Sequence, residues 1–195
     1  MLSNNRKHIE LAYSLLFSLP GAPVIRYGEE LGMGDDLSLK ERLSVRTPMQ
    51  WTDEKNGGFT SADTAFRPVI NKGDYGYQQL NVAKQFRDPN SLLSWTSRII
   101  KLRKSCPEIG LGDYTLIDSG SPDILAIRYD YNGKSLIILH NFNPQSRQAS
   151  IKSEKMKVLY DLMAENLDKK AESGKFSVSL DGYGYKWYRV DSIIP

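Results

Sequence analysis

The hydrophobic pattern of this chain changes its period close to residue 110. Before that point, two segments at about 5–19 and 92–104 repeat apolar residues at the spacing of an α-helix. After Gly112, apolar and polar residues alternate with a period of two, which is the spacing of β-strands. The pair Asn132-Gly133 between two such runs is a strong signal for a tight hairpin. We therefore expect an α/β, loop-rich first part over residues 1–110 and an all-β domain over residues 111–195.

The expected strands of the second part are short and joined by turns, which is typical of an antiparallel β-sandwich or barrel. They cover residues 114–117, 124–131, 135–140, 147–151, 157–162, 175–180 and 185–190. The aromatic residues Tyr183, Tyr185 and Trp187 lie in or beside the last of these strands, and we interpret them as core and edge residues of the sandwich.

The first part has one short β-rich run between a helix and a long polar loop. The helix ends at Pro20 and Gly21, and the run Val24–Tyr27 is predicted to be a strand. From residue 28 to about 81, glycine, proline, aspartate and asparagine recur, but the aromatic residues of this segment argue against disorder. We interpret it as an ordered loop over the rim of a barrel, followed by a helical turn at about 81–86.

Composition and charge exclude several classes of protein. The formal net charge is +3 from dispersed residues, and Lys101, Arg103 and Lys104 lie where a helix ends and its dipole favours cations, so no nucleic-acid partner is expected. No apolar run approaches the ~20 residues that span a membrane, and the N-terminus lacks the pattern of a signal peptide. The single cysteine, Cys106, excludes an internal disulfide, and we expect a buried thiol and a cytoplasmic location.

Two motifs of the first part resemble the end of the catalytic barrel in the α-amylase family of glycoside hydrolases (family 13). They are Gly-x-Pro-x-x-x-Tyr-Gly-Glu-Glu, over residues 21–30, and Arg-Thr-Pro-Met-Gln-Trp, over residues 46–51. Residues 31–35, 56–59 and 75–82 further resemble the trehalose synthases, which are related to the oligo-α-glucosidases. The resemblance implies a terminal fragment of a TIM (β/α)8 barrel, with its seventh helix, eighth strand and eighth helix, followed by an antiparallel β-sandwich.

The resemblance implies an enzyme that cleaves or isomerises α-glucosidic bonds with retention, on an α-glucoside or a sugar such as maltose or trehalose, without a cofactor. In this family an Asp nucleophile, a Glu acid/base and a second Asp come from strands four, five and seven, the last within Asn-His-Asp. This sequence has no such motif, and His8 and His140 match no catalytic position. We therefore expect no catalytic residue in this chain, polypeptide upstream that supplies them, and no activity of the chain alone.

The resemblance also implies one substrate-binding residue, Arg46. In the glucosidase members, the arginine of this motif contacts the sugar at the cleavage site, and a guanidinium fork suits vicinal hydroxyls or a neighbouring carboxylate. The alternative is a salt bridge from Arg46 that only stiffens the loop. Tyr27, Glu29, Gln50 and Trp51 are expected to be structural residues of the barrel rim.

Neither carboxylate pair of the first part predicts a catalytic or metal site. Adjacent residues that leave a strand point in opposite directions, so Glu29 and Glu30 cannot flank one glycosidic bond at ~5 Å. Glu29 is expected to support the rim through hydrogen bonds instead. Asp35 and Asp36 are too few for the roughly six to eight oxygen ligands of calcium, and a solvated turn is expected there.

Alternatives remain for the aromatic residues and for the whole chain. Trp51, Phe59, Tyr75 and Tyr77 could stack on sugar rings, but we favour packing within their own loop. The β domain also allows a non-catalytic carbohydrate-binding or interaction module. The ectodomain of an amino-acid transporter heavy chain would share the fold, but this sequence has no membrane anchor. In the barrel interpretation strand eight lacks its neighbours, so we expect the isolated chain to self-associate.

Overall fold

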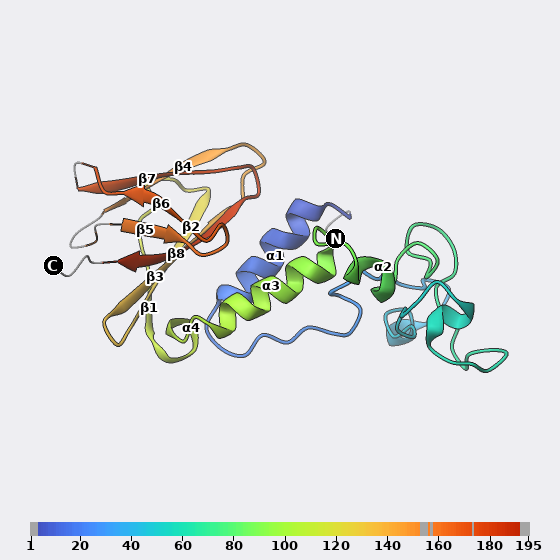
Figure 1. The fold of residues 1–195 in the computed structure, drawn as a ribbon. Helices are drawn as coiled ribbons and strands as arrows, with labels where there is room; N and C mark the ends of the chain where they lie inside the picture. Colours follow the sequence, from blue (N-terminus) through green and yellow to red (C-terminus); the bar gives the residue numbers. More distant parts are fainter. Residues whose placement is uncertain (1–3, 153–155, 157, 173, 192–195) are drawn as a thin grey trace. The chain divides into compact units, whose positions relative to one another are not determined.

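The computed structural model describes residues 4–152, 156, 158–172 and 174–191. Two compact units are present, one of residues 1–23 with 99–195 and the other of residues 24–98. The helices are α1 (Arg6–Ser18), η1 (Glu41–Leu43), η2 (Lys55–Gly58), α2 (Val82–Phe86), α3 (Leu92–Lys104) and α4 (Glu108–Leu111), as labelled in part in Figure 1. Side-chain oxygens cap the starts of α1, α2 and α3: Asn5 accepts from Lys7 N, Asn81 from Lys84 N, and Ser91 from Ser94 N.

The larger unit contains two antiparallel sheets (Figure 1). One has six strands in the order β1-β2-β3-β8-β5-β6, and the other pairs β4 with β7. The strands are β1 (Asp113–Leu116), β2 (Ile124–Tyr131), β3 (Lys134–Asn141), β4 (Arg147–Lys152), β5 (Val158–Asp161), β6 (Asn166–Lys170), β7 (Lys175–Leu180) and β8 (Tyr185–Asp191). The turn between β2 and β3 has Asn132 at φ 49° and Gly133 at φ 74°, the left-handed conformations of a type I′ turn. The hairpin prediction is therefore confirmed.

One hydrophobic core joins the two sheets. Strands β4 and β7 alternate exposed and buried residues, so one face of each points inward. Ile151 of β4 and Phe176 of β7 belong to the same buried cluster as Ile137 of β3 and Tyr188 of β8. The period of two that the sequence shows after Gly112 thus corresponds to a sheet face buried against a second sheet.

Helix α1 packs on β3 and β8 through buried polar groups. Ser14 Oγ accepts the indole N–H of Trp187 at 2.9 Å and lies 3.0 Å from His140 Nε2. The hydroxyl of Tyr129 in β2 donates to Ser18 O at 2.5 Å, and burial raises the pKa of Tyr129 to about 12. All five side chains are inaccessible to solvent. Helix α1 is therefore bonded to three strands of the larger sheet.

Arg103 holds the C-terminal end of α1. Its guanidinium donates to the carbonyl oxygens of Phe17, of Leu19 at 3.1 Å and of Gly21 at 2.5 Å. Carbonyls at the end of a helix have no partner within it, so Arg103 satisfies groups that would otherwise need water. Arg103, one of the three basic residues at the end of α3, therefore makes structural contacts. Cys106 is buried, as expected, and burial raises the pKa of its thiol.

The predicted helices and most predicted strands are present, but the prediction of a strand at Val24–Tyr27 was wrong. Those residues are irregular, and Val24 is 84% exposed. A strand needs hydrogen-bonded neighbours, and none of the described residues pairs with this segment. The polar edge strand β6 was missed. Of the strand predicted at 157–162, Lys157 lies outside the described residues.

The helices end at Leu111 and the strands begin at Asp113, but α1 and residues from Ile99 belong to the compact unit that contains the sheets. The separation of residues 1–110 from 111–195 as two domains stays a prediction. Within the described ranges, no helix combines the length and apolar character that a bilayer crossing requires.

Candidate functional site

A tight turn after residue 27 presents two carboxylates to different surroundings. Gly28 has φ +87°, and a Cβ there would lie 2.5 Å from Met33 Sδ, so the position requires glycine. Its carbonyl accepts the N–H groups of Leu31 at 3.1 Å and Met33 at 2.9 Å, and Leu31 is buried. The motif Tyr-Gly-Glu-Glu is therefore a fixed turn in this structure.

The two glutamates of this turn differ in role. Glu29 accepts the backbone N–H of Arg26 through Oε2 at 3.1 Å, which supports the turn. Its place at a barrel rim stays a prediction. Glu30 lines a cavity, and its buried Oε2 has no hydrogen-bond partner among the described residues. The two carboxylates therefore do not act as a pair.

The segment 46–51 is buried in its middle and accessible at its ends. Residues Thr47 to Gln50 are buried, whereas Arg46 is exposed and Trp51 is 48% exposed. The amide of Gln50 donates to the carbonyl oxygens of Tyr75 at 3.0 Å and Leu80 at 2.5 Å. The buried residues anchor the segment, so that Arg46 and Trp51 project from a fixed backbone.

Backbone hydrogen bonds close the loop that follows this segment. The N–H groups of Trp51 and Thr52 both donate to Gly57 O, at 2.8 and 3.0 Å. Val82 N donates to Gln50 O at 3.0 Å and Ala83 N to Trp51 O at 3.0 Å, which joins α2 to the segment 46–51. The loop is thus an ordered structure, consistent with its aromatic content.

These residues enclose a cavity of about 490 Å³ whose surface is mostly apolar. It is lined by Tyr27, Glu30, Arg46, Pro48, Met49, Trp51, Phe59, Phe66 and Arg67. The described lining therefore carries two guanidinium groups and one carboxylate among aromatic and aliphatic walls. A cavity of this size with a few convergent polar groups is typical of a small-molecule site.

The cavity suits a ligand with flat apolar faces and an oxygen-rich edge. The rings of Trp51, Phe59 and Phe66 are 48%, 51% and 100% exposed and can pack on a ligand. The fork of Arg46 can donate two hydrogen bonds to adjacent oxygens. The Tyr27 hydroxyl donates to Thr47 O at 3.1 Å, so Tyr27 offers its ring.

Some of these residues were predicted from the sequence, and others were missed. Arg46, Tyr27 and Trp51 line the cavity, whereas Gln50 is buried outside its lining and Glu29 is bonded within the turn. The salt bridge weighed for Arg46 is not formed with any described residue. Packing within the loop was favoured for Trp51 and Phe59, but both are half exposed at the cavity. Phe66 and Arg67 were missed as lining residues. The signal that could have identified them is an aromatic residue next to a basic one in a polar loop.

The other candidate residues lie elsewhere. Asp36 Oδ1 accepts from the N–H and hydroxyl of Ser38 at 3.0 and 2.6 Å, which is the expected solvated turn. The part of the chain that the structure describes contains no group of three metal-ligating side chains. His8 packs edge to face on Tyr183, with ring centroids 4.2 Å apart.

Two family models match the chain. The model of the α-amylase catalytic domain matches residues 1–112. The model of the C-terminal domain of sucrose hydrolase-like proteins matches residues 133–189.

Characterised relatives match over nearly the whole chain. A trehalose synthase of Pimelobacter sp. (strain R48) is 34% identical over 97% of this chain and 35% of its own length. An oligo-1,6-glucosidase of Halalkalibacterium halodurans is 27% identical over 90% of this chain and 36% of its own length. This chain therefore spans about a third of the length of these relatives.

Solved structures share the fold. An α-amylase of H. orenii superposes with a TM-score of 0.73 at 23% identity, over 97% of this chain and 36% of that enzyme. A trehalulose synthase of Pseudomonas mesoacidophila MX-45 superposes with a TM-score of 0.73 at 21% identity, over 97% of this chain and 40% of that enzyme.

Proposed function

Because this chain belongs to the α-amylase family, we propose that it is the C-terminal portion of an enzyme that cleaves or isomerises α-glucosidic bonds with retention of configuration. Its substrate is an α-glucoside or a disaccharide such as maltose or trehalose. The similarity to a trehalose synthase supports isomerisation, and the similarity to an oligo-1,6-glucosidase supports hydrolysis. In this proposal residues 1–110 are the last elements of a TIM barrel, residues 111–195 are a β-sandwich, and the enzyme is cytoplasmic.

The observation that carries the proposal is the cavity around Arg46. Both motifs that resemble the family contribute to it: Tyr27 and Glu30 from the first, and Arg46 and Trp51 from the second. A pyranose ring has an apolar C–H face and an edge of hydroxyl groups. The aromatic walls match the face, and the guanidinium of Arg46 matches the hydroxyl edge.

The reactive carboxylates belong to polypeptide outside these 195 residues. A retaining glycosidase needs two carboxyl groups ~5 Å apart, one as nucleophile and one as acid/base. Glu30 is the single carboxylate among the described residues that line the cavity. This chain would bind and orient the sugar, while residues from outside it break and form the glycosidic bond.

The apolar walls have a separate part in the proposed reaction. Hydrolysis and isomerisation differ in whether water or the released sugar attacks the glycosyl-enzyme intermediate. Apolar side chains such as Trp51, Phe59 and Met49 can exclude water from the space beside the bond. Arg46 can hold the bound sugar through the sugar's hydroxyl groups while the glycosyl-enzyme intermediate exists.

The proposal predicts that the chain alone turns over neither maltose nor trehalose. A chimera in which this chain replaces the matching segment of the Pimelobacter trehalose synthase should convert maltose, measured by chromatography of the sugars. The chain alone is the matched control. Turnover by the chain alone, or a folded chimera that binds maltose and does not react, would contradict the proposed division of labour.

A second candidate is a non-catalytic carbohydrate-binding module, which the exposed aromatic walls of the cavity favour. Isothermal titration of the chain with maltose and trehalose separates the two functions. Strong binding by the chain alone supports the module, because part of an active site should bind weakly. The variant Trp51→Ala should abolish any such binding if it occurs in this cavity.

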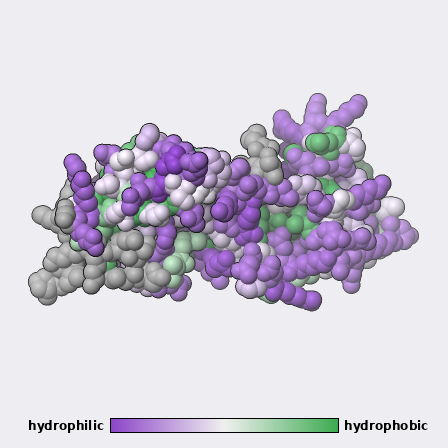
Figure 2. All heavy atoms as spheres, turned by 90° about the horizontal axis from the view of Figure 1, so that it is seen from above, coloured by the Kyte–Doolittle hydropathy of each residue, from purple (hydrophilic) through white to green (hydrophobic). Residues whose placement is uncertain are grey.

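We further propose that the isolated chain self-associates. In the unit of residues 24–98, Val24, Leu37, Phe66 and Phe86 are between 79% and 100% exposed, and Figure 2 shows hydrophobic patches among the mostly hydrophilic surface of one face. Large exposed apolar groups favour association. Sedimentation velocity should show a dimer or larger species that increases with concentration, and a strictly monomeric profile would contradict this expectation.

A further inference from the structure

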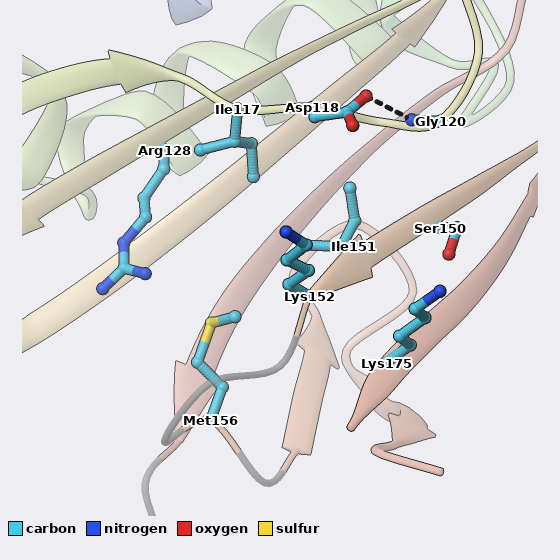
Figure 3. Close-up of a pocket in the computed structure, with 9 residues that line it drawn as sticks. All are labelled: Ile117, Asp118, Gly120, Arg128, Ser150, Ile151, Lys152, Met156 and Lys175. Atoms are coloured by element: carbon cyan, nitrogen blue, oxygen red, sulfur yellow. Dashed lines mark hydrogen bonds between the residues drawn. The ribbon is translucent and has the colours of Figure 1, made fainter. Parts of the chain in front are cut away.

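A second hollow lies in the β-rich unit and has a different chemistry. It encloses about 370 Å³ and is lined by Ile117, Asp118, Gly120, Arg128, Ser150, Ile151, Lys152, Met156 and Lys175 (Figure 3). Its lining contains three cationic side chains, one carboxylate and three apolar side chains. The hollow contains no aromatic residue among its described lining, in contrast to the cavity around Arg46.

Two of the cations are direct cross-strand neighbours. Lys152 is the last residue of β4, and the antiparallel register places it opposite Lys175, the first residue of β7. Both are exposed, and neither forms an ion pair with any described residue. Like charges directly opposite each other on a sheet destabilise it. An anion bound between them would remove this repulsion.

The third cation is held in place by its own strand. Arg128 donates from Nε and Nη2 to the two carboxylate oxygens of Asp130, at 2.8 and 2.9 Å. Arg128 is therefore a fixed guanidinium at the hollow, partly neutralised by Asp130, whereas the two lysines contribute net charge.

The rest of the lining includes one carboxylate that is already hydrogen-bonded and three apolar side chains. Asp118, the single carboxylate among the described lining, accepts Gly120 N at 2.8 Å through Oδ1. Ile117, Ile151 and Met156 supply an apolar wall, and Ile151 belongs to the core between the sheets. Figure 3 shows Met156, Ile117 and Arg128 on one side of Lys152 and Ser150 with Lys175 on the other.

We propose that this hollow is a binding site for a small phosphorylated ligand. Its phosphate group contacts the ammonium groups of Lys152 and Lys175, and its uncharged body packs on Ile117, Ile151 and Met156. A phosphate accepts charge-assisted hydrogen bonds from both lysines, and ammonium groups are usual protein donors to it. This site is separate from the sugar cavity around Arg46, since the two share no lining residue.

Titration calorimetry at constant ionic strength tests the proposal on the full 195-residue chain, with inorganic phosphate, glucose 1-phosphate and glucose as probes. Both phosphates should bind. The double variant Lys152→Gln/Lys175→Gln should bind them at least about tenfold more weakly, because hydrogen bonds to charged groups are lost. Tighter binding of glucose 1-phosphate than of phosphate identifies an organic phosphate as the ligand, and equal binding identifies free phosphate.

The matched control is Lys101→Gln/Lys134→Gln, which removes the same charge from two exposed lysines outside the hollow. It should bind phosphate as the unmodified chain does. In chloride, the Lys152/Lys175 double variant should melt no lower than the unmodified chain, because the repulsion is gone. No phosphate binding, undiminished binding by the double variant, equal loss in the control, or a lower melting temperature in chloride would each overturn the proposal.

Discussion

Replacement of Arg46 by alanine is expected to reduce kcat/KM for maltose by about a hundredfold or more in the chimera with the Pimelobacter enzyme. The side chain is exposed at the cavity and forms no ion pair with any described residue, so its donors are available to a ligand. Two hydrogen bonds from a charged donor contribute about 3 kcal/mol, which corresponds to roughly that factor. Because the neighbouring residues Thr47 to Gln50 are buried and anchor the backbone, the loop should keep its structure.

Two variants separate this role from a structural one. Arg42→Ala removes an arginine that is also exposed, lies four positions earlier and does not line the cavity, so it should leave kcat/KM unchanged. Arg46→Lys keeps the charge but loses the planar fork, and it should recover only part of the activity. If Arg46→Ala lowered the melting temperature and left kcat/KM intact, Arg46 would be a stiffening residue after all.

The fold was predictable where local pattern decides it. The helices α1 and α3 and the strands β2 and β7 follow from apolar periodicity, and the Asn132-Gly133 turn follows from the need for two positive φ angles. Strand β6 has the sequence Asn-Leu-Asp-Lys-Lys, and only its pairing with β5 makes it a strand. Val24–Tyr27 shows the opposite case, since β-favouring residues stay irregular without partners.

The candidate site was predictable only in part. Arg46 came from the resemblance of a six-residue motif, and neither composition nor periodicity distinguishes it from Arg42. Phe66 and Arg67 reach the same cavity across nearly twenty positions of irregular loop. The conformation of this part of the chain includes long-range hydrogen bonds such as that from Gln50 to Tyr75 O, which no local pattern encodes. The motif located the site, while the loop conformation determined its walls.

The change of hydrophobic period near residue 110 did not predict that α1 packs against the sheets. This association depends on Ser14, a polar residue in an apolar stripe, and on two residues of distant strands, His140 and Trp187. The periodicity of apolar residues does not predict such polar contacts. Their burial nevertheless makes them important, because a buried polar group without its partner is costly.

Acidification should therefore destabilise the chain through His140. Burial lowers the pKa of His140 to about 4, and this effect outweighs a hydrogen bond to the backbone of Ser14, which favours the charged form. In the unfolded chain the pKa returns to about 6.5. The folded state favours the neutral imidazole. The contribution of His140 to the free energy of unfolding is therefore complete above pH 6.5 and is lost as the pH falls toward 4. The loss amounts to about 3 kcal/mol of unfolding free energy.

Urea unfolding of the unmodified chain and of His140→Gln at pH 7.5 and at pH 4 measures this contribution. The carboxylates are common to both proteins, so the difference between their pH dependences isolates His140. The chain has two histidines, and His8→Gln is the control that should keep the full acid-induced loss. An equal loss of stability in His140→Gln would mean that protonation of His140 is not coupled to unfolding, and that the bond between α1 and β3 tolerates a charged imidazole.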